Sequence, residues 1–93
     1  MKIQETNLKK KDTLYYARIL ERTGIYEVCE LSVRTVERNY FVGTDKRDKH
    51  AYLFMNDDLG KSVFYDRKDA LNTVKEAEKN RRLISDEIYY EED

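Results

Sequence analysis

The stretch Ile25–Val36, Ile-Tyr-Glu-Val-Cys-Glu-Leu-Ser-Val-Arg-Thr-Val, gives the clearest indication of the fold. From Cys29 to Val33 apolar and polar residues alternate, and this period of two is typical of a β-strand with one buried face. The alternation fails near both ends, because Tyr26 and Val28 are apolar on the otherwise polar side and Val36 is out of step. We therefore expect a bulge or a sharp bend, as small barrels need at their corners.

Four further segments are rich in β-forming residues and are bounded by turn residues. A turn that ends at Gly24 precedes the stretch above, and a wholly charged hairpin loop, residues 45–49, follows the segment Asn39–Thr44. The turn over residues 56–60 contains Leu59, which we expect to plug into the core. The four predicted strands are Thr13–Leu20, Asn39–Thr44, His50–Met55 and Lys61–Tyr65.

After the last of these strands the pattern changes to that of a helix. Asp66 is a suitable N-cap, and Asp69 gives an acidic first turn that suits the helix dipole. One apolar stripe follows at helical spacing, so we predict a helix over Arg67–Arg82. The residues of the stripe are Ala70, Leu71, Val74 and Ala77.

These elements predict an α+β fold that is mostly β. A small, partly open five-stranded antiparallel barrel of the Src-homology-3-like type, followed by one C-terminal helix, fits best, and a five-stranded sheet with the helix across one face is the alternative. A chain of 93 residues has room for one core. We assign residues 13–84 to this domain, residues 1–12 to a flexible basic arm and residues 85–93 to an acidic tail.

The charge of the chain is unevenly distributed. The 18 Lys and Arg and 19 Asp and Glu residues give a net charge of −1. Residues 1–84 carry 18 basic and 14 acidic side chains, a net charge of +4, whereas residues 85–93 carry five acidic side chains and no basic one. The near-neutral total is therefore a cancellation, and it does not exclude an anionic partner.

Motifs for catalysis or for metal binding are missing. A metal site needs several Cys, His or acidic ligands close together, but the chain has one cysteine, Cys29, and one histidine, His50. We expect Cys29 to be a small core residue, His50 to lie on the surface, and Asp57 and Asp58 to form a turn. No glycine-rich phosphate loop or nucleophile elbow occurs. We therefore expect no enzyme and no cofactor.

The same features indicate a soluble protein of the cytoplasm. A single cysteine suits a reducing compartment, the first residues do not resemble a signal peptide, and no apolar run is long enough for a membrane span.

Basic residues occur in several groups that together could bind phosphates, with tyrosines stacking on bases. Acidic residues lie among them, so a solvated surface of mixed charge is the simpler interpretation. The residues of this nucleic-acid-binding alternative are Lys9, Lys10, Lys11, Lys75, Lys79, Arg81 and Arg82.

The acidic tail allows three interpretations. It can be a disordered solubilising end, it can dock into a basic groove or imitate a nucleic-acid backbone, or it can fold back on the basic helix of its own chain. We predict partner binding by Asp86, Glu87, Tyr89, Tyr90, Glu91, Glu92 and Asp93. We predict a second contact by the hairpin residues Asp45, Lys46, Arg47, Asp48 and Lys49.

Between about Leu14 and Asn80 the chain resembles a group of small uncharacterised proteins from phages and integrative elements of Firmicutes and gut bacteria. The resemblance rests on Asp48–Phe54, on Asp58–Phe64 and on the start of the helix at Arg67. These motifs are structural and imply a fold. The source implied by the resemblance favours a counter-defence inhibitor, of which anti-CRISPR proteins are the best-known group.

We therefore expect a non-enzymatic protein–protein interaction module of phage or mobile-element origin. It would inhibit a host nucleic-acid-handling or defence protein, such as a nuclease, by covering its surface or by mimicking nucleic acid. The alternative is a small nucleic-acid-binding barrel that uses its basic helix and lysine arm. The sequence does not indicate the oligomeric state.

Overall fold

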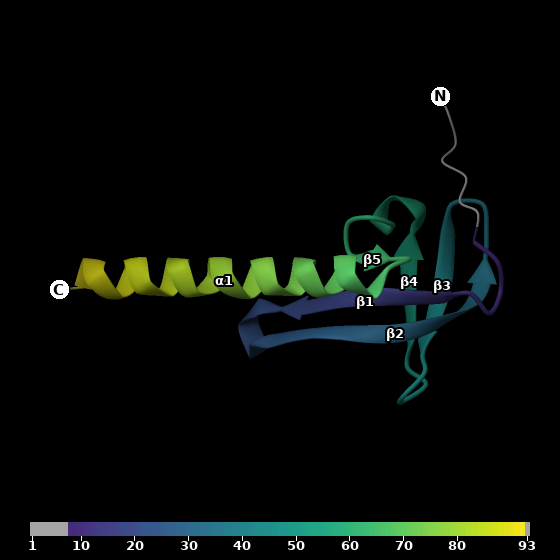
Figure 1. Ribbon diagram of the computed structural model, residues 1–93, viewed down its shortest axis with the longest axis horizontal. Coiled ribbons are helices and arrows are strands. Elements are labelled where there is room, and N and C mark those ends of the chain that lie inside the picture. Colours follow the sequence, from purple (N-terminus) through teal and green to yellow (C-terminus); the bar gives the residue numbers. More distant parts are fainter. Residues whose placement is uncertain (1–7, 93) are drawn as a thin grey trace, which may run out of the picture.

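The computed structural model describes the backbone of residues 8–92 and the side chains of residues 8–81. Five strands come first and one long helix follows (Figure 1). The strands are β1 (Thr13–Leu20), β2 (Ile25–Val36), β3 (Tyr40–Asp45), β4 (Ala51–Met55) and β5 (Val63–Phe64), and the helix is α1 (Arg67–Glu92). Single turns of 3-10 helix, η1 (Glu21–Thr23) and η2 (Asn56–Asp58), follow β1 and β4.

The strands form one curled sheet in the order β4-β3-β2-β1-β5. Every neighbouring pair is antiparallel. The sheet is a half-barrel that η2 and β5 bring round toward closure, and α1 packs against β1 and β2. The predicted small five-stranded antiparallel barrel or sheet with one C-terminal helix is confirmed. The bounds of β1 and β2 are those predicted, whereas β5 is shorter.

The predicted irregularity at the end of β2 is a β-bulge. The register with β3 shifts between Val33 and Thr35, so that Val33 pairs with Gly43 and Val36 pairs with Phe41. The extra residue returns Val36 to the inner face of the sheet, which explains why the apolar pattern is out of step there.

No such shift occurs at the start of β2, so the bend predicted there is wrong. The register between β1 and β2 is continuous from the pair Leu20–Ile25 to the pair Thr13–Ser32. Tyr26 and Val28 instead pack against the cluster that α1 covers. They are apolar because α1 covers the face of the sheet on which they lie.

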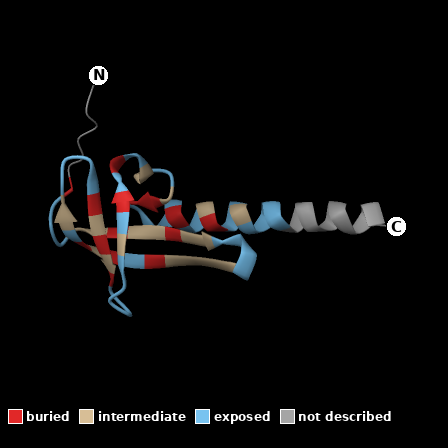
Figure 2. Cartoon of the chain, turned by 180° about the vertical axis from the view of Figure 1, so that it is seen from behind, coloured by how far each residue is buried: buried red, intermediate tan, exposed pale blue. Residues whose placement is uncertain are grey.

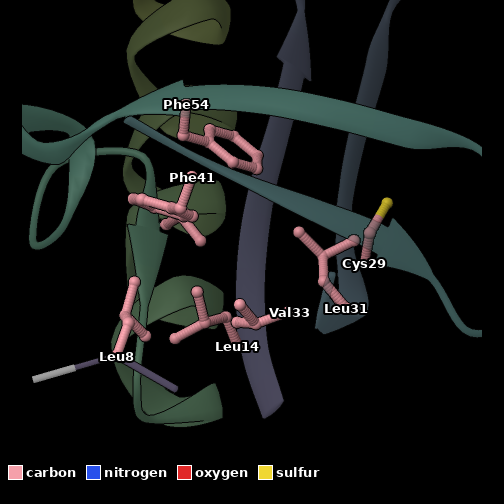
Figure 3. Close-up of a cluster of buried hydrophobic side chains, with 8 residues drawn as sticks. Leu8, Leu14, Cys29, Leu31, Val33, Phe41 and Phe54 are labelled. Carbon is pink, nitrogen blue, oxygen red and sulfur yellow. The ribbon is translucent and has the colours of Figure 1, made fainter. Parts of the chain in front are cut away.

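Two clusters of buried side chains lie on opposite faces of β1 and β2. The buried residues occur along the strands and in the first turns of α1 (Figure 2). The inner cluster fills the curl of the sheet, and Figure 3 shows Phe41 and Phe54 in it beside Leu14 and Leu31. Leu59 packs against it from the turn after β4, as predicted. The outer cluster, under α1, consists of Ala17, Phe64, Ala70 and Val74.

Residues 8–12 lie against the barrel, although the sequence predicts a flexible arm there. Leu8 is buried in the inner cluster, and the backbone N–H of Lys11 donates to the carbonyl of Val33 at 2.7 Å. The remainder of the predicted arm, residues 1–7, lies outside the described residues.

Helix α1 starts as predicted and ends later. The carboxylate of Asp66 accepts the backbone N–H of Lys68 at 3.0 Å, so Asp66 is the expected N-cap. The helix continues to Glu92 instead of ending at Arg82, because neither glycine nor proline interrupts the segment. Leu71, a member of the predicted apolar stripe, is exposed.

Candidate interaction surface

The hairpin between β3 and β4 is built on a buried carboxylate. Asp45 is 2% exposed, and its Oδ1 atom accepts the backbone N–H of Arg47 at 2.7 Å. Burial would raise the pKa of Asp45, but hydrogen bonds from the backbone N–H groups of Arg47 and Asp48 outweigh burial and lower it. Asp45 therefore stabilises the turn, and its predicted contact with a partner stays a prediction.

The other hairpin residues are exposed, and some are held by neighbours. Lys46 Nζ lies 2.9 Å from Glu30 Oε2 and 2.9 Å from Thr13 Oγ1. Arg47 Nη2 is 4.0 Å from Glu27 Oε1, and its side chain is 74% exposed. Asp48 accepts the backbone N–H of His50 within the turn. Arg47 is thus freer to bind a partner than Lys46.

A solvent-open pocket of about 350 Å³ lies beside this hairpin. Its wall joins apolar side chains of the sheet to cations from the hairpin and from the first turn of α1. The lining residues are Tyr15, Val28, Cys29, Glu30, Asp45, Lys46, Arg47 and Arg67. Tyr15 and Arg67 were not among the predicted site residues, because only the fold brings them beside the hairpin.

Cys29 is a core residue, as predicted. It is 3% exposed, and its Sγ atom lies 3.6 Å from Glu27 Oε2. The Glu27 carboxylate also binds the guanidinium of Arg18 at 2.9 Å. Burial, with the negative charge of Glu27, raises the pKa of the Cys29 thiol to about 12. The thiol is therefore neutral at physiological pH and a poor nucleophile.

The basic residues of the nucleic-acid alternative do not come together. The segment before β1 lies at one end of the molecule, whereas α1 extends toward the other (Figure 1). The Arg81 guanidinium lies over the ring of Tyr26, 5.9 Å from its centroid. The other described side chains of this set are exposed, and that of Arg82 is not described; the exposed ones are Lys9, Lys10, Lys11, Lys75 and Lys79.

The predicted acidic contact residues fall at the C-terminal end of α1. The backbone of residues 85–92 belongs to this helix, but the side chains there lie outside the described residues, as does Asp93 entirely. The predicted contacts of Asp86, Glu87, Tyr89, Tyr90, Glu91, Glu92 and Asp93 stay predictions.

Exposed apolar side chains gather on the outer face of β3 and β4. Leu53 is 63% exposed and Met55 is 52% exposed, and Tyr40 pairs with Met55 across the two strands. The sequence signal for this surface is the run Ala51–Met55, in which every residue is apolar or aromatic although only one face of an edge strand is buried.

Comparison with protein-family models, with curated proteins and with solved structures yields no match. The resemblance to phage and mobile-element proteins therefore stays a prediction. Within the described part of the chain, no three His, Cys, Asp or Glu residues are grouped so that they could hold a metal ion. No helix there has both the length and the apolar character needed to span a membrane.

Proposed function

We propose that this chain is a non-enzymatic protein-interaction module that binds an acidic segment of its partner in the pocket beside the β3–β4 hairpin. The observation that supports this proposal is the presence of Arg47 and Arg67 in one open pocket with Tyr15 and Val28. Arginine and tyrosine are enriched at protein interfaces, and a guanidinium binds a carboxylate through two parallel hydrogen bonds.

The balance of charge in the pocket favours an anion. Lys46 is neutralised by Glu30, and the Asp45 carboxylate is enclosed by the backbone of its own turn. Arg47 has a 4.0 Å ion pair with Glu27 but its side chain stays 74% exposed, and Arg67 is exposed as well. Tyr15 and Val28 supply apolar surface beside these two cations. An acidic side chain next to an apolar or aromatic one has the complementary chemistry.

The more specific proposal comes from the resemblance and from the small size of the chain. The partner is a host nucleic-acid-handling or defence protein, and binding inhibits it by covering its surface. The carboxylates at the end of α1 would supply the second, acidic contact.

Affinity capture from a lysate of the host tests the pocket. A double charge reversal, Arg47→Glu with Arg67→Glu, should abolish capture of the protein that the unmodified chain retains. The matched control is Lys10→Glu with Lys79→Glu, which changes the net charge equally at exposed positions outside the pocket. Equal capture by both double variants would refute the pocket as the binding site.

A chain that ends at Ile84 tests the acidic contact separately. If residues 85–93 bind the partner, this chain should keep its fold by circular dichroism and lose most of its affinity. Unchanged affinity would remove the acidic segment from the proposal.

Nucleic-acid binding is the second candidate, and the arrangement supports it less. The described basic residues of this set are divided between residues 9–11 and α1, and Arg81 is engaged with Tyr26 within the chain. This candidate predicts binding to DNA or RNA that weakens steeply with added salt. Absence of any mobility shift at low salt would exclude it.

A further inference from the structure

Strand β2 extends past the end of its neighbour β3, and this leaves part of its edge open. β3 pairs with β2 from Leu31 to Val36, whereas β1 pairs with β2 from Ile25 to Ser32. Residues 25–29 of β2 therefore have no strand on their β3 side among the described residues. Figure 1 shows the long β1–β2 hairpin extending beyond β3 and β4. An open strand edge is a template for pairing with an incoming strand.

One hydrogen bond shows which backbone groups of β2 face this open edge. The backbone N–H of Lys46, just after the end of β3, donates to the carbonyl of Glu30 at 3.0 Å. Because the direction of bonding alternates along an antiparallel ladder, the even-numbered residues of this part of β2 face the β3 side. The N–H and C=O groups of Tyr26 and Val28 therefore point to the open edge, and no hydrogen bond with another described residue occupies them.

The open edge of β2 leads into the pocket beside the β3–β4 hairpin. Val28, Cys29 and Glu30 are consecutive residues of β2 in the lining of this pocket, which Arg47 and Arg67 also line. A ligand held by the two guanidinium groups thus lies beside free backbone groups of a strand. In β-strand addition, such backbone groups supply affinity, and pockets for alternate side chains supply specificity.

We infer that the acidic segment of the partner binds as an extended strand, antiparallel to β2, along the edge that β3 leaves open. The ligand residues opposite Val28 and Tyr26 each exchange two backbone hydrogen bonds with their β2 partner. The ligand residue between these two directs its N–H away from β2. The inference rests on the proposed function, because it specifies the conformation and the sequence pattern of the ligand in the proposed pocket.

The side chains along the edge define this sequence pattern. Residues directly opposite each other in two strands lie on the same face of the sheet, so the residue opposite Val28 faces the pocket, where Arg47 and Arg67 favour a carboxylate. The residue opposite Tyr26 meets a half-buried ring. Leu71, exposed one turn after Arg67, adds apolar surface on the same side of α1. The expected pattern is an acidic residue, any residue and an apolar residue, in that order.

The acidic side chains at this edge are compatible with such a ligand. Glu27 and Glu30 each pair with a basic side chain at 2.9 Å, and the carboxylate of Asp48 accepts a backbone N–H of its own turn. Glu78 is exposed about two turns after Leu71 on the same side of α1 and disfavours a second acidic residue beyond the pocket. The pocket is therefore the part of this edge that attracts a carboxylate.

Titration of the full chain with short blocked peptides, followed by NMR spectroscopy, tests the inference. The probe is acetyl-Thr-Glu-Thr-Phe-Thr-amide, whose glutamate lies opposite Val28 and whose phenylalanine lies opposite Tyr26. We expect saturable binding that slows hydrogen exchange at the amides of Val28 and Tyr26 and leaves that of Leu53, on the far edge of the sheet, unchanged. The matched peptide with lysine in place of glutamate should bind at least about tenfold more weakly.

N-methylated forms of the probe test the strand pairing without any change to the protein. A methyl group on the glutamate or phenylalanine nitrogen removes a hydrogen bond to β2 and blocks the approach of the strand, so binding should weaken at least about tenfold. A methyl group on the central threonine nitrogen, which points away from β2, should leave most of the affinity. Equal affinity of all three methylated peptides would overturn the inference and leave the proposed pocket in place.

Proline variants test the same backbone groups from the side of the protein. Val28→Pro removes an N–H that faces the open edge and should abolish binding. The matched control is Ile19→Pro, whose N–H faces the opposite edge of the same hairpin and whose side chain packs against the same outer cluster. Circular dichroism shows whether each variant folds, and the methylated peptides decide where one does not. A probe that does not bind, or whose affinity ignores Arg47→Glu with Arg67→Glu, would overturn the proposed function together with the inference.

Discussion

The two faces of β1 and β2 are buried by different kinds of side chain. On the inner face, the ring centroids of Phe41 and Phe54 lie 5.4 Å apart, and Tyr16 meets Phe54 edge-on at 4.9 Å. On the outer face, Ala17 and Ala70 are buried under α1. Aromatic rings stack within the curl of the sheet, whereas the two alanines let the helix approach the outer face closely, beside Phe64 and Val74. We therefore expect the inner cluster to dominate the stability of the fold.

The largest effect should come from the inner cluster. Phe41 is fully buried, and Phe41→Ala should lower the free energy of unfolding by about 3–5 kcal/mol, through lost burial and the cavity left behind. Chemical denaturation measures this change. Leu53→Ala, on the exposed outer face, is the control and should change stability by less than about 0.5 kcal/mol at a concentration where the chain is monomeric.

A smaller effect should come from the layer beneath α1. Val74→Ala removes two buried methyl groups and should cost about 1–2 kcal/mol. Hydrogen exchange in α1 should accelerate more than in β2 and β3, because the helix loses its anchor. The control Lys75→Ala, at the exposed neighbouring position, should change neither the stability nor the hydrogen exchange of α1. A loss as large as that of Phe41→Ala would show that the two clusters contribute equally.

A substitution at Gly24, in the turn between β1 and β2, tests whether α1 contacts this end of the β1–β2 hairpin. Gly24 has a φ of +69°, and a Cβ atom there would lie 3.0 Å from Arg81 Nη1. Gly24→Ala should cost about 1–2 kcal/mol from the left-handed backbone alone. Gly60, with a φ of +87°, has no atom within 4 Å of such a Cβ, so Gly60→Ala gives the backbone cost without a contact. If Gly24→Ala lowers the free energy of unfolding more than Gly60→Ala does, and Arg81→Ala removes this difference, the contact between the turn and α1 is confirmed.

The smallest effect at neutral pH concerns Cys29. Because burial raises the pKa of its thiol to about 12, the unfolded chain loses this proton at lower pH than the folded chain. The folded state then binds more protons, so stability should fall as the pH rises from about 9 toward 12 and should be unaffected below that range. Cys29→Ala should show a shallower alkaline decline, measured by denaturation at each pH. Identical slopes would contradict the raised pKa.

The sequence predicts the strands well where one face is buried and less well where burial changes. The bulge after Val33 is visible because Val36 is apolar at an even-numbered position, out of step with Leu31 and Val33. The apolar residues Tyr26 and Val28 look like the same signal, but they reflect a helix packed on the second face. A single sequence does not distinguish these causes, because both put apolar residues on the side expected to be polar.

The end of α1 and the pocket could not be predicted for physical reasons. Acidic residues near a helix C-terminus oppose the helix dipole, which favours an early end, but this effect is weaker than the cooperativity of an uninterrupted helix. The meeting of Arg67 with Arg47 depends on how the helix returns across the sheet. The burial of Asp45 depends on backbone N–H groups, which leave no trace in the sequence.

The shortness of β5 has a consequence for how many copies can assemble. A sheet that extends at both edges grows without limit and forms fibres, whereas a two-fold contact that uses up its own surface closes. With two residues, Val63 and Phe64, β5 offers almost no template to an incoming strand. Of the two terminal strands of the sheet, β4 is therefore the one whose edge is long enough to accept a further strand.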